Sequence, residues 1–132
     1  MIGLDTNILV RYFAQDEPKQ SQAAAKLIES LTPDSPGLVT AIVLAETVWV
    51  MEDIYGADRE RIAEIVETLL RTRTLIVQNA EAIWRALSRY RSGNADFVDC
   101  AIERLCHELG CRQTFTFDKQ ASRHARMTLL GG

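Results

Sequence analysis

Histidine, cysteine and proline are scarce in this chain of 132 residues, which contains two, three and three of them. The cysteines Cys100, Cys106 and Cys111 cannot all pair with one another, so we expect reduced thiols in a cytoplasmic protein. A helix would separate Cys100 from Cys111 by about 16 Å, which is too far for one zinc ion. His107 and His124 are expected at the surface, and no G-x-S-x-G motif is present. The sequence therefore gives little support to a hydrolase that uses a side-chain nucleophile.

The chain also lacks a long apolar run and a strong net charge. The longest nearly apolar stretch, residues 41–51, is interrupted by Glu46 and Thr47 and is too short to span a bilayer, so we expect no membrane contact. The start of the chain has no basic segment typical of a signal peptide, which favours a cytoplasmic location. Composition and length predict one globular domain over residues 1–132.

The charged residues are unevenly distributed along the chain. The net charge is −3, which excludes a histone-like polyanion binder. Residues 1–58 contain three basic and nine acidic side chains, whereas residues 59–132 contain twelve and nine. Of the 15 basic residues 12 are arginine, which can bind phosphate with two parallel hydrogen bonds but also commonly solvates helix faces. The composition alone does not distinguish arginines that bind phosphate from arginines that only solvate helix faces.

Hydrophobic periodicity predicts strands that alternate with helices. The predicted strands lie at residues 1–4, 38–40, 75–77, 114–117 and 127–130. The predicted helices lie at residues 6–13, 19–31, 41–55, 59–71, 80–91 and 96–109. This order indicates an α/β protein with a three-layer α/β/α arrangement, in which helices cover both faces of a mainly parallel sheet of four to five strands.

Two of the predicted strands end at an aspartate, Asp5 and Asp118. Open parallel sheets bind ligands beyond the carboxyl ends of their strands, although each aspartate could also be a turn residue or a helix N-cap. Glu46 has Ile42 and Trp49 as helical neighbours, so we expect it on a buried face. A buried carboxylate is costly unless it is paired, protonated or bound to metal, and a salt bridge with an arginine is the alternative.

Asp96 and Asp99 lie three residues apart at the start of a predicted helix and therefore share one face. Acids in a first turn also complement the helix dipole, so a purely structural role is again an alternative. We expect all five acids at the same edge of the sheet. Clustered carboxylates raise one another's pKa, which fits a site that normally holds cations. Oxygen ligands without histidine or cysteine select Mg²⁺ or Mn²⁺.

Four segments of the sequence resemble the PIN-domain ribonucleases, specifically the VapC-like toxins of bacterial type II toxin–antitoxin pairs. The matching segments are MIGLDTNIL at residues 1–9, Ala45-Glu46 in its apolar helix, ADFVDCAI at residues 95–102, and TFTFD at residues 114–118. The resemblance implies a single PIN-like domain and a Mg²⁺-dependent endoribonuclease, in which Mn²⁺ can substitute. It also implies a growth-inhibiting toxin, with RNA as substrate, a cognate antitoxin as partner, and a homodimer as the assembly.

The resemblance also assigns roles to individual residues. The site acids it implies are Asp5, Glu46, Asp96, Asp99 and Asp118, of which Asp5, Asp99 and Asp118 would hold the metal. The residues that would order the site are Thr6, Asn7 and Thr116. Two features depart from the family pattern: Glu103 and Arg104 replace small residues, and the segment after Asp118 is not typical.

The arginine-rich second half supplies candidate contacts to RNA. Arg85 and Arg89 are the main candidates for binding phosphates, and Arg71, Arg73 and Arg91 are further ones. Trp84 and Tyr90 either stack on bases or pack in the core, and their helical spacing favours the core. A non-catalytic PIN-like binding module is the alternative function. A receiver domain resembles the chain less well, because its paired acids and late lysine have no counterparts.

Overall fold

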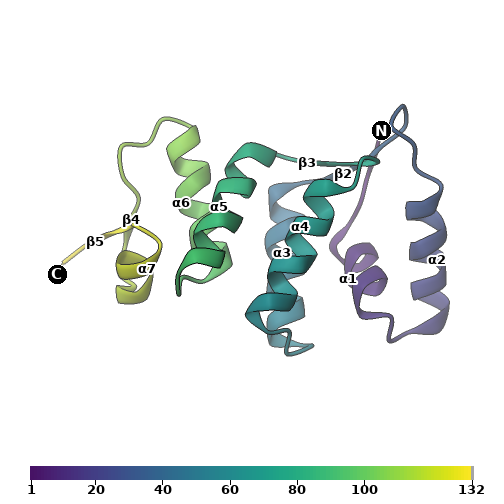
Figure 1. Cartoon of the computed structure of the whole chain (residues 1–132), viewed down its shortest axis with the longest axis horizontal. Coiled ribbons are helices and arrows are strands. Elements are labelled where there is room, and N and C mark those ends of the chain that lie inside the picture. Colours follow the sequence, from purple (N-terminus) through teal and green to yellow (C-terminus); the bar gives the residue numbers. More distant parts are fainter. Residues whose placement is uncertain (132) are drawn as a thin grey trace. The chain divides into compact units, whose positions relative to one another are not determined.

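The computed structural model describes residues 1–131 (Figure 1). These residues form two compact units, one from Met1 to Gln78 and one that begins at Asn79. The prediction of one domain over the whole chain stays a prediction. No helix of the described residues is long and apolar enough to cross a membrane.

The first unit contains a parallel sheet of three strands and four helices. The strands are β1 (Ile2–Gly3), β2 (Gly37–Val39) and β3 (Leu75–Val77), in the order β1-β2-β3. The helices are α1 (Thr6–Ala14), α2 (Pro18–Glu29), α3 (Ala41–Asp53) and α4 (Arg59–Arg71). In the central strand, Gly37 lies opposite Ile2 and Leu75. A Cβ atom at Gly37 would come within 2.9 Å of Leu4 and Leu31 side chains, so close packing favours glycine here.

The core of the first unit is made by apolar side chains from the sheet and the helices. In α4, Ile62, Ile65, Val66 and Leu69 recur at helical spacing and are buried, as the sequence pattern predicts. The helix begins where predicted, because the carboxylate of Asp58 accepts a hydrogen bond of 2.8 Å from the backbone N–H of Arg61. Burial of this stripe fixes the position of α4 in the first unit.

The second unit contains three helices and a pair of parallel strands. They are α5 (Ala80–Ser92), α6 (Phe97–Glu108), β4 (Phe115–Thr116), α7 (Lys119–His124) and β5 (Thr128–Leu129). Helices α5 and α6 lie side by side (Figure 1), and the rings of Tyr90 and Phe97 meet edge to face with centroids 5.7 Å apart. Tyr90 is buried, so it packs in the core, which is the alternative that its spacing favoured.

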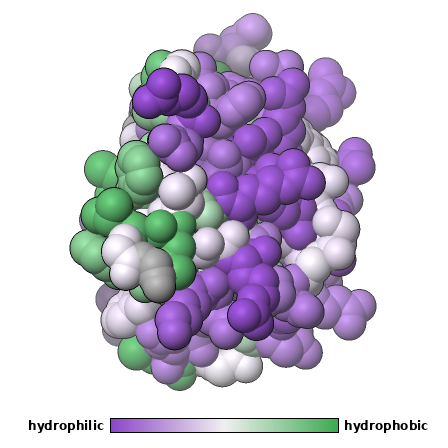
Figure 2. Space-filling view, turned by 90° about the vertical axis from the view of Figure 1, so that its left-hand side faces the viewer, coloured by the Kyte–Doolittle hydropathy of each residue, from purple (hydrophilic) through white to green (hydrophobic). Residues whose placement is uncertain are grey.

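The face of the second unit shown in Figure 2 is mostly hydrophilic, and apolar side chains gather along one side of it. The exposed apolar residues of this unit include Phe115, Phe117 and Leu130.

The observed elements agree closely with those that the sequence predicts, and the alternation of helices with parallel strands confirms the α/β class. The five strands differ in one respect, because they divide into sheets of three and two instead of forming one sheet. Helix α7 was not predicted. It has six residues, which is too short for apolar spacing to reveal it.

Candidate active site

In the first unit, Asp5 lies just beyond β1 and begins α1. Its Oδ1 accepts a hydrogen bond of 2.7 Å from the backbone N–H of Thr6, and Asp5 is the N-cap of the helix. The side chain is exposed. Asp5 thus has the capping role that the sequence offered as an alternative, at the strand end where a ligand site was expected.

Thr6 connects Asp5 to a residue far along the chain. Its hydroxyl group donates a hydrogen bond of 2.8 Å to Oε1 of Glu46 in α3. This bond brings Glu46 to the N-terminal end of α1, so Asp5, Thr6 and Glu46 form one polar cluster, called here the first acidic cluster. Asn7 is also exposed, and it lines a separate hollow of about 350 Å³ with residues of α1 and α2.

The expectation that Glu46 lies on a buried face is wrong. Glu46 is exposed, and its neighbours Ile42 and Trp49 are 74% and 55% exposed. The buried residues of α3 are Leu44, Thr47, Val48 and Met51. Because α3 is apolar on almost every side, the apolar neighbours of Glu46 did not indicate which face packs against the core. The contact with Thr6, and not burial, links Glu46 to the site.

In the second unit, Asp96 and Asp118 are the N-caps of α6 and α7. Asp96 accepts a hydrogen bond of 3.3 Å from the backbone N–H of Asp99, which places these two acids on one turn. Asp118 accepts a bond of 2.8 Å from the backbone N–H of Gln120. Thr116 accepts a bond of 3.0 Å from the backbone N–H of Asp118, so it orders the turn that carries this acid.

The surroundings of Asp99 change its ionisation. Burial raises the pKa of Asp99, and the negative charges of Asp96 and Asp118 raise it further. Asp96, Asp99 and Asp118 are therefore close enough to interact electrostatically, and together they form the second acidic cluster. Within residues 1–131, no three histidine, cysteine, aspartate or glutamate side chains have the arrangement of a complete metal site.

Capping and ligand binding are compatible roles for these aspartates. An ionised carboxylate has two oxygens and about four lone-pair sites. The capping bonds involve Oδ1 of Asp5 and of Asp118. Each side chain therefore has further acceptor capacity beyond its bond to the helix.

The two arginines suggested as phosphate contacts have different surroundings. Arg85 is 57% exposed at its side chain and forms an ion pair of 3.3 Å with Glu108. Arg89 is only 13% exposed, forms an ion pair with Glu103, and donates a bond of 3.3 Å to the carbonyl oxygen of Ala125. Arg89 is thus largely buried and connects α5 to α6 and to the segment after α7, and its contact with phosphate stays a prediction.

Glu103 is the buried acid that the sequence analysis missed. It lies in α6, and its carboxylate binds both Arg89 and Arg104. Burial alone would raise the pKa of Glu103, but hydrogen bonds and charge from the two arginines outweigh burial and hold the pKa below its usual range. The signal in the sequence was an acid on the same helix face as the apolar residues Phe97 and Cys100.

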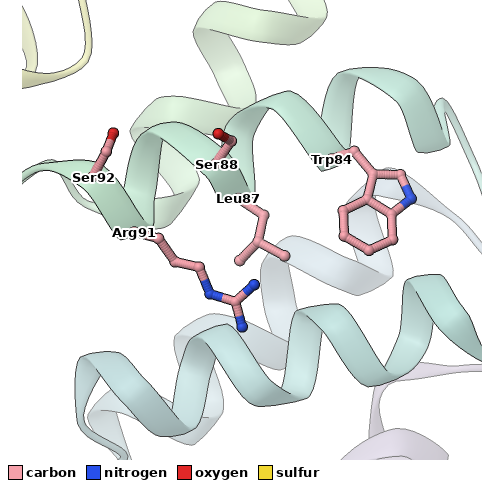
Figure 3. A pocket seen from close by; sticks show the side chains of 5 residues that line it. All are labelled: Trp84, Leu87, Ser88, Arg91 and Ser92. Carbon is pink, nitrogen blue, oxygen red and sulfur yellow. The ribbon is translucent and has the colours of Figure 1, made fainter.

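Helix α5 carries a second candidate for nucleic-acid contact. A hollow of about 310 Å³ runs along it, and Trp84, Leu87 and Arg91 extend from one side of the helix while Ser88 and Ser92 lie at its other edge (Figure 3). Trp84 is half-buried. It is therefore partly accessible, unlike Tyr90, and base stacking stays open for Trp84 alone.

The fold and its acidic strand ends are those of a known family: the family model of the PIN domain matches residues 2–127, and the chain belongs to this family. The match spans both units. Among curated proteins, the chain is similar to the VapC ribonuclease of Aquifex aeolicus (strain VF5), with 27% identity over 118 residues, which are 89% of this chain and 87% of that protein. The family match and this relative confirm the resemblance to VapC-like PIN-domain proteins and the PIN-like α/β fold.

A solved structure is also similar to this chain. It is the crystal structure of VapC20 from Mycobacterium tuberculosis, described as a sarcin-ricin loop cleaving toxin. The likeness covers 93% of this chain and 94% of that one, with 20% sequence identity and a TM-score of 0.48.

Proposed function

We propose that this protein is a divalent-metal-dependent endoribonuclease, which hydrolyses RNA phosphodiester bonds and acts as the growth-inhibiting toxin of a toxin–antitoxin pair. Membership of the PIN family over residues 2–127 supports the proposal. So does similarity to a protein named VapC ribonuclease. The acids of both clusters, Asp5, Glu46, Asp96, Asp99 and Asp118, would serve the same reaction.

The observation that carries the proposal is the second acidic cluster, in which Asp96 and Asp118 lie close enough to act on the charge of Asp99. Burial and two neighbouring carboxylates make its negative charge unfavourable, and this cost is offset when a cation is present. All of the candidate metal ligands are carboxylate oxygens. Ligands of this kind bind hard cations, with Mg²⁺ as the first choice and Mn²⁺ as a substitute. The family resemblance assigns the ion to Asp5, Asp99 and Asp118.

The chain's own residues have distinct tasks in this reaction. A bound cation would supply Lewis acidity and neutralise negative charge on the phosphoryl group. Glu46, held by the hydroxyl group of Thr6, would accept a hydrogen bond from the attacking water and orient it. Asp96 positions the first turn that carries Asp99, and Thr116 positions Asp118 through its backbone N–H. These positioning contacts limit the freedom of the acids before substrate binds.

The proposal includes an antitoxin, a homodimer and a cytoplasmic location. The family relationship supports the antitoxin as a second protein that controls the nuclease. The family relationship also supports the homodimer. The three cysteines are free, which agrees with a reducing compartment.

The test is RNA cleavage by purified protein. Total RNA is incubated with the protein and Mg²⁺, and new 5′ ends are mapped for the wild type and for Asp5→Asn, Asp99→Asn and Asp34→Asn. Asparagine caps helices as well as aspartate, so Asp5→Asn keeps α1 intact and removes only the charge. Asp34 is an exposed loop residue outside both clusters and serves as the matched control.

We expect cleavage by the wild type and by Asp34→Asn, and its loss in both site variants and after chelation of the metal. Unchanged cleavage by a folded Asp5→Asn, Asp99→Asn double variant would refute the nuclease assignment. A wild type that binds RNA without cutting it would instead identify a non-catalytic PIN-like module.

A further inference from the structure

A second polar site lies in the second unit, outside both acidic clusters. It is a hollow of about 260 Å³, called here the arginine hollow. The residues that line it are Arg85, Ser88, Arg89, Ser92, Arg104 and Arg126. Arg104 and its neighbour Glu103 are the two residues that the resemblance marks as departures from the family pattern in this helix.

Glu103 holds two of these arginines in fixed positions. Its carboxylate accepts bonds of 2.7 and 3.1 Å from Arg104, and it also pairs with Arg89. The three side chains are only 10–16% exposed. Arg89 further donates to the carbonyl oxygen of Ala125, which anchors the residue just before Arg126. The wall of the hollow is therefore ordered by buried contacts before any ligand arrives.

The arginine hollow has an excess of positive charge. Four arginines line it, and the acids that pair with them are Glu103 and Glu108, so two positive charges are not balanced. Arg126 is exposed, and no acid among residues 1–131 forms an ion pair with it. Its backbone has a φ of 62°, a left-handed conformation that is uncommon for a residue other than glycine. The site thus exposes cationic groups at a defined turn.

We propose that the arginine hollow binds a backbone phosphate of the single-stranded RNA on which the enzyme acts, an inference that rests on the proposed function. Arginine presents several N–H donors in a planar fork that matches phosphate oxygens, and Ser88 and Ser92 add hydroxyl donors. The volume is below the range of about 300–1,000 Å³ that is usual for small-molecule sites, and it suits a single anionic group. Arg85 and Arg126 are the contacts, whereas Glu103 holds Arg89 and Arg104, and Arg89 anchors Ala125 beside Arg126.

The neighbouring hollow favours RNA over an acidic peptide. Ser88 and Ser92 also line the hollow along α5 that contains Trp84 and Arg91 (Figure 3). The two hollows therefore share an edge, with arginines on one side of it and an aromatic ring on the other. Alternation of cationic and aromatic groups is how proteins bind single strands, because phosphates pair with arginine while bases stack on aromatic rings.

The test is binding of a fluorescent single-stranded RNA, measured by anisotropy over a range of salt concentrations, with EDTA to prevent cleavage. The variant is Arg85→Ala with Arg126→Ala, and the control is Arg112→Ala with Arg123→Ala. The control removes the same charge from two exposed arginines of the second unit that do not line the hollow. Circular dichroism verifies that both variants are folded.

Each phosphate contact that is lost should lower the slope of log K against log salt by about 0.7, and the hollow binds one phosphate, so the site variant should lose about 0.7. At about 0.1 M salt this corresponds to binding that is about 5-fold weaker, taking 1 M as the reference. The control should keep the wild-type slope. An unchanged slope in the site variant would overturn the proposal, and so would arginine-dependent binding of poly-glutamate in place of RNA, which would indicate a protein partner.

The outcome is independent of the nuclease assignment, because binding is measured without a divalent cation. If the slope falls as expected but the wild type never cleaves RNA, the arginine hollow stands and the proposed nuclease function fails. If Asp5→Asn abolishes cleavage while the arginine variant binds normally, the nuclease function stands and the arginine hollow is refuted.

Discussion

Glu103→Gln tests whether the buried ion pairs of α6 hold the second unit together. Glutamine has nearly the same shape as glutamate and lacks the charge, so the substitution leaves Arg89 and Arg104 without their counter-ion. Both arginines are largely buried, with side chains 13% and 16% exposed. A charge that stays buried after its partner is removed is costly, and this cost decides the sign of the effect.

The magnitude follows from that burial. Removing one partner of a fully buried pair costs about 3–5 kcal/mol, and the remaining acceptor oxygen and partial exposure reduce this to about 2–3 kcal/mol. A chain of this length has an unfolding entropy near 0.28 kcal/mol per degree, so about 1 kcal/mol corresponds to about 4 °C. Glu103→Gln should therefore lower the melting temperature by about 8–12 °C.

The pH dependence of the melting temperature distinguishes a loss of charge from a loss of packing. The pKa of Glu103 is lowered in the folded protein, so its contribution to stability is complete above the pKa of an ordinary glutamate, about 4.3. This contribution is lost as the pH falls through the pKa of Glu103 in the folded protein, because protonation then removes the charge from the wild type as well. The difference in melting temperature between wild type and variant should stay constant between about pH 5 and 7 and should disappear in more acidic solution.

Thermal melts by circular dichroism over this pH range provide the measurement, with Glu108→Gln as the control. Glu108 lies in the same helix but pairs with the exposed Arg85, and such pairs contribute less than about 1 kcal/mol. A stability change in Glu103→Gln as small as that of the control would refute the reasoning. A gap that persists unchanged at acidic pH would show that lost packing, and not charge, is responsible.

Two further outcomes are expected. Asp99→Asn should raise the melting temperature in EDTA, because burial, Asp96 and Asp118 disfavour its charge; a lower melting temperature would contradict the repulsion in the second acidic cluster. Thr6→Val should reduce RNA cleavage by about tenfold at saturating RNA, because Glu46 loses its hydrogen bond, while Thr6→Ser should retain activity. Equal rates for the valine and serine variants would remove Thr6 from the site.

The fold was largely predictable because its elements carry short-range signals. Asp58 and Asp96 cap helices at the expected positions, and the apolar stripe of α4 has a clear helical period. The number of strands was also predictable. How five strands divide into sheets was not, because pairing depends on contacts between residues far apart in the sequence.

The acids were identifiable from their positions at strand and helix ends, but their burial was not. Glu46 was predicted to be an acid on a buried helix face, but it is exposed. Glu103 is the acid that lies on such a face. Helix α3 has no polar face to set the orientation, whereas α6 has one, so only the second helix allowed the face to be read from the sequence. The bond between Thr6 and Glu46 spans 40 positions and leaves no local signal.

The N-cap positions explain why the same aspartates can serve both the fold and the reaction. Asp5, Asp96 and Asp118 each begin a helix, and a cap fixes the carboxylate relative to the backbone N–H groups of the first turn. Those N–H groups lie at the positive end of the helix dipole. In the second acidic cluster, burial together with the negative charges of Asp96 and Asp118 raises the pKa of Asp99. The helices therefore position the acids, and a bound cation would supply the charge balance that the chain lacks.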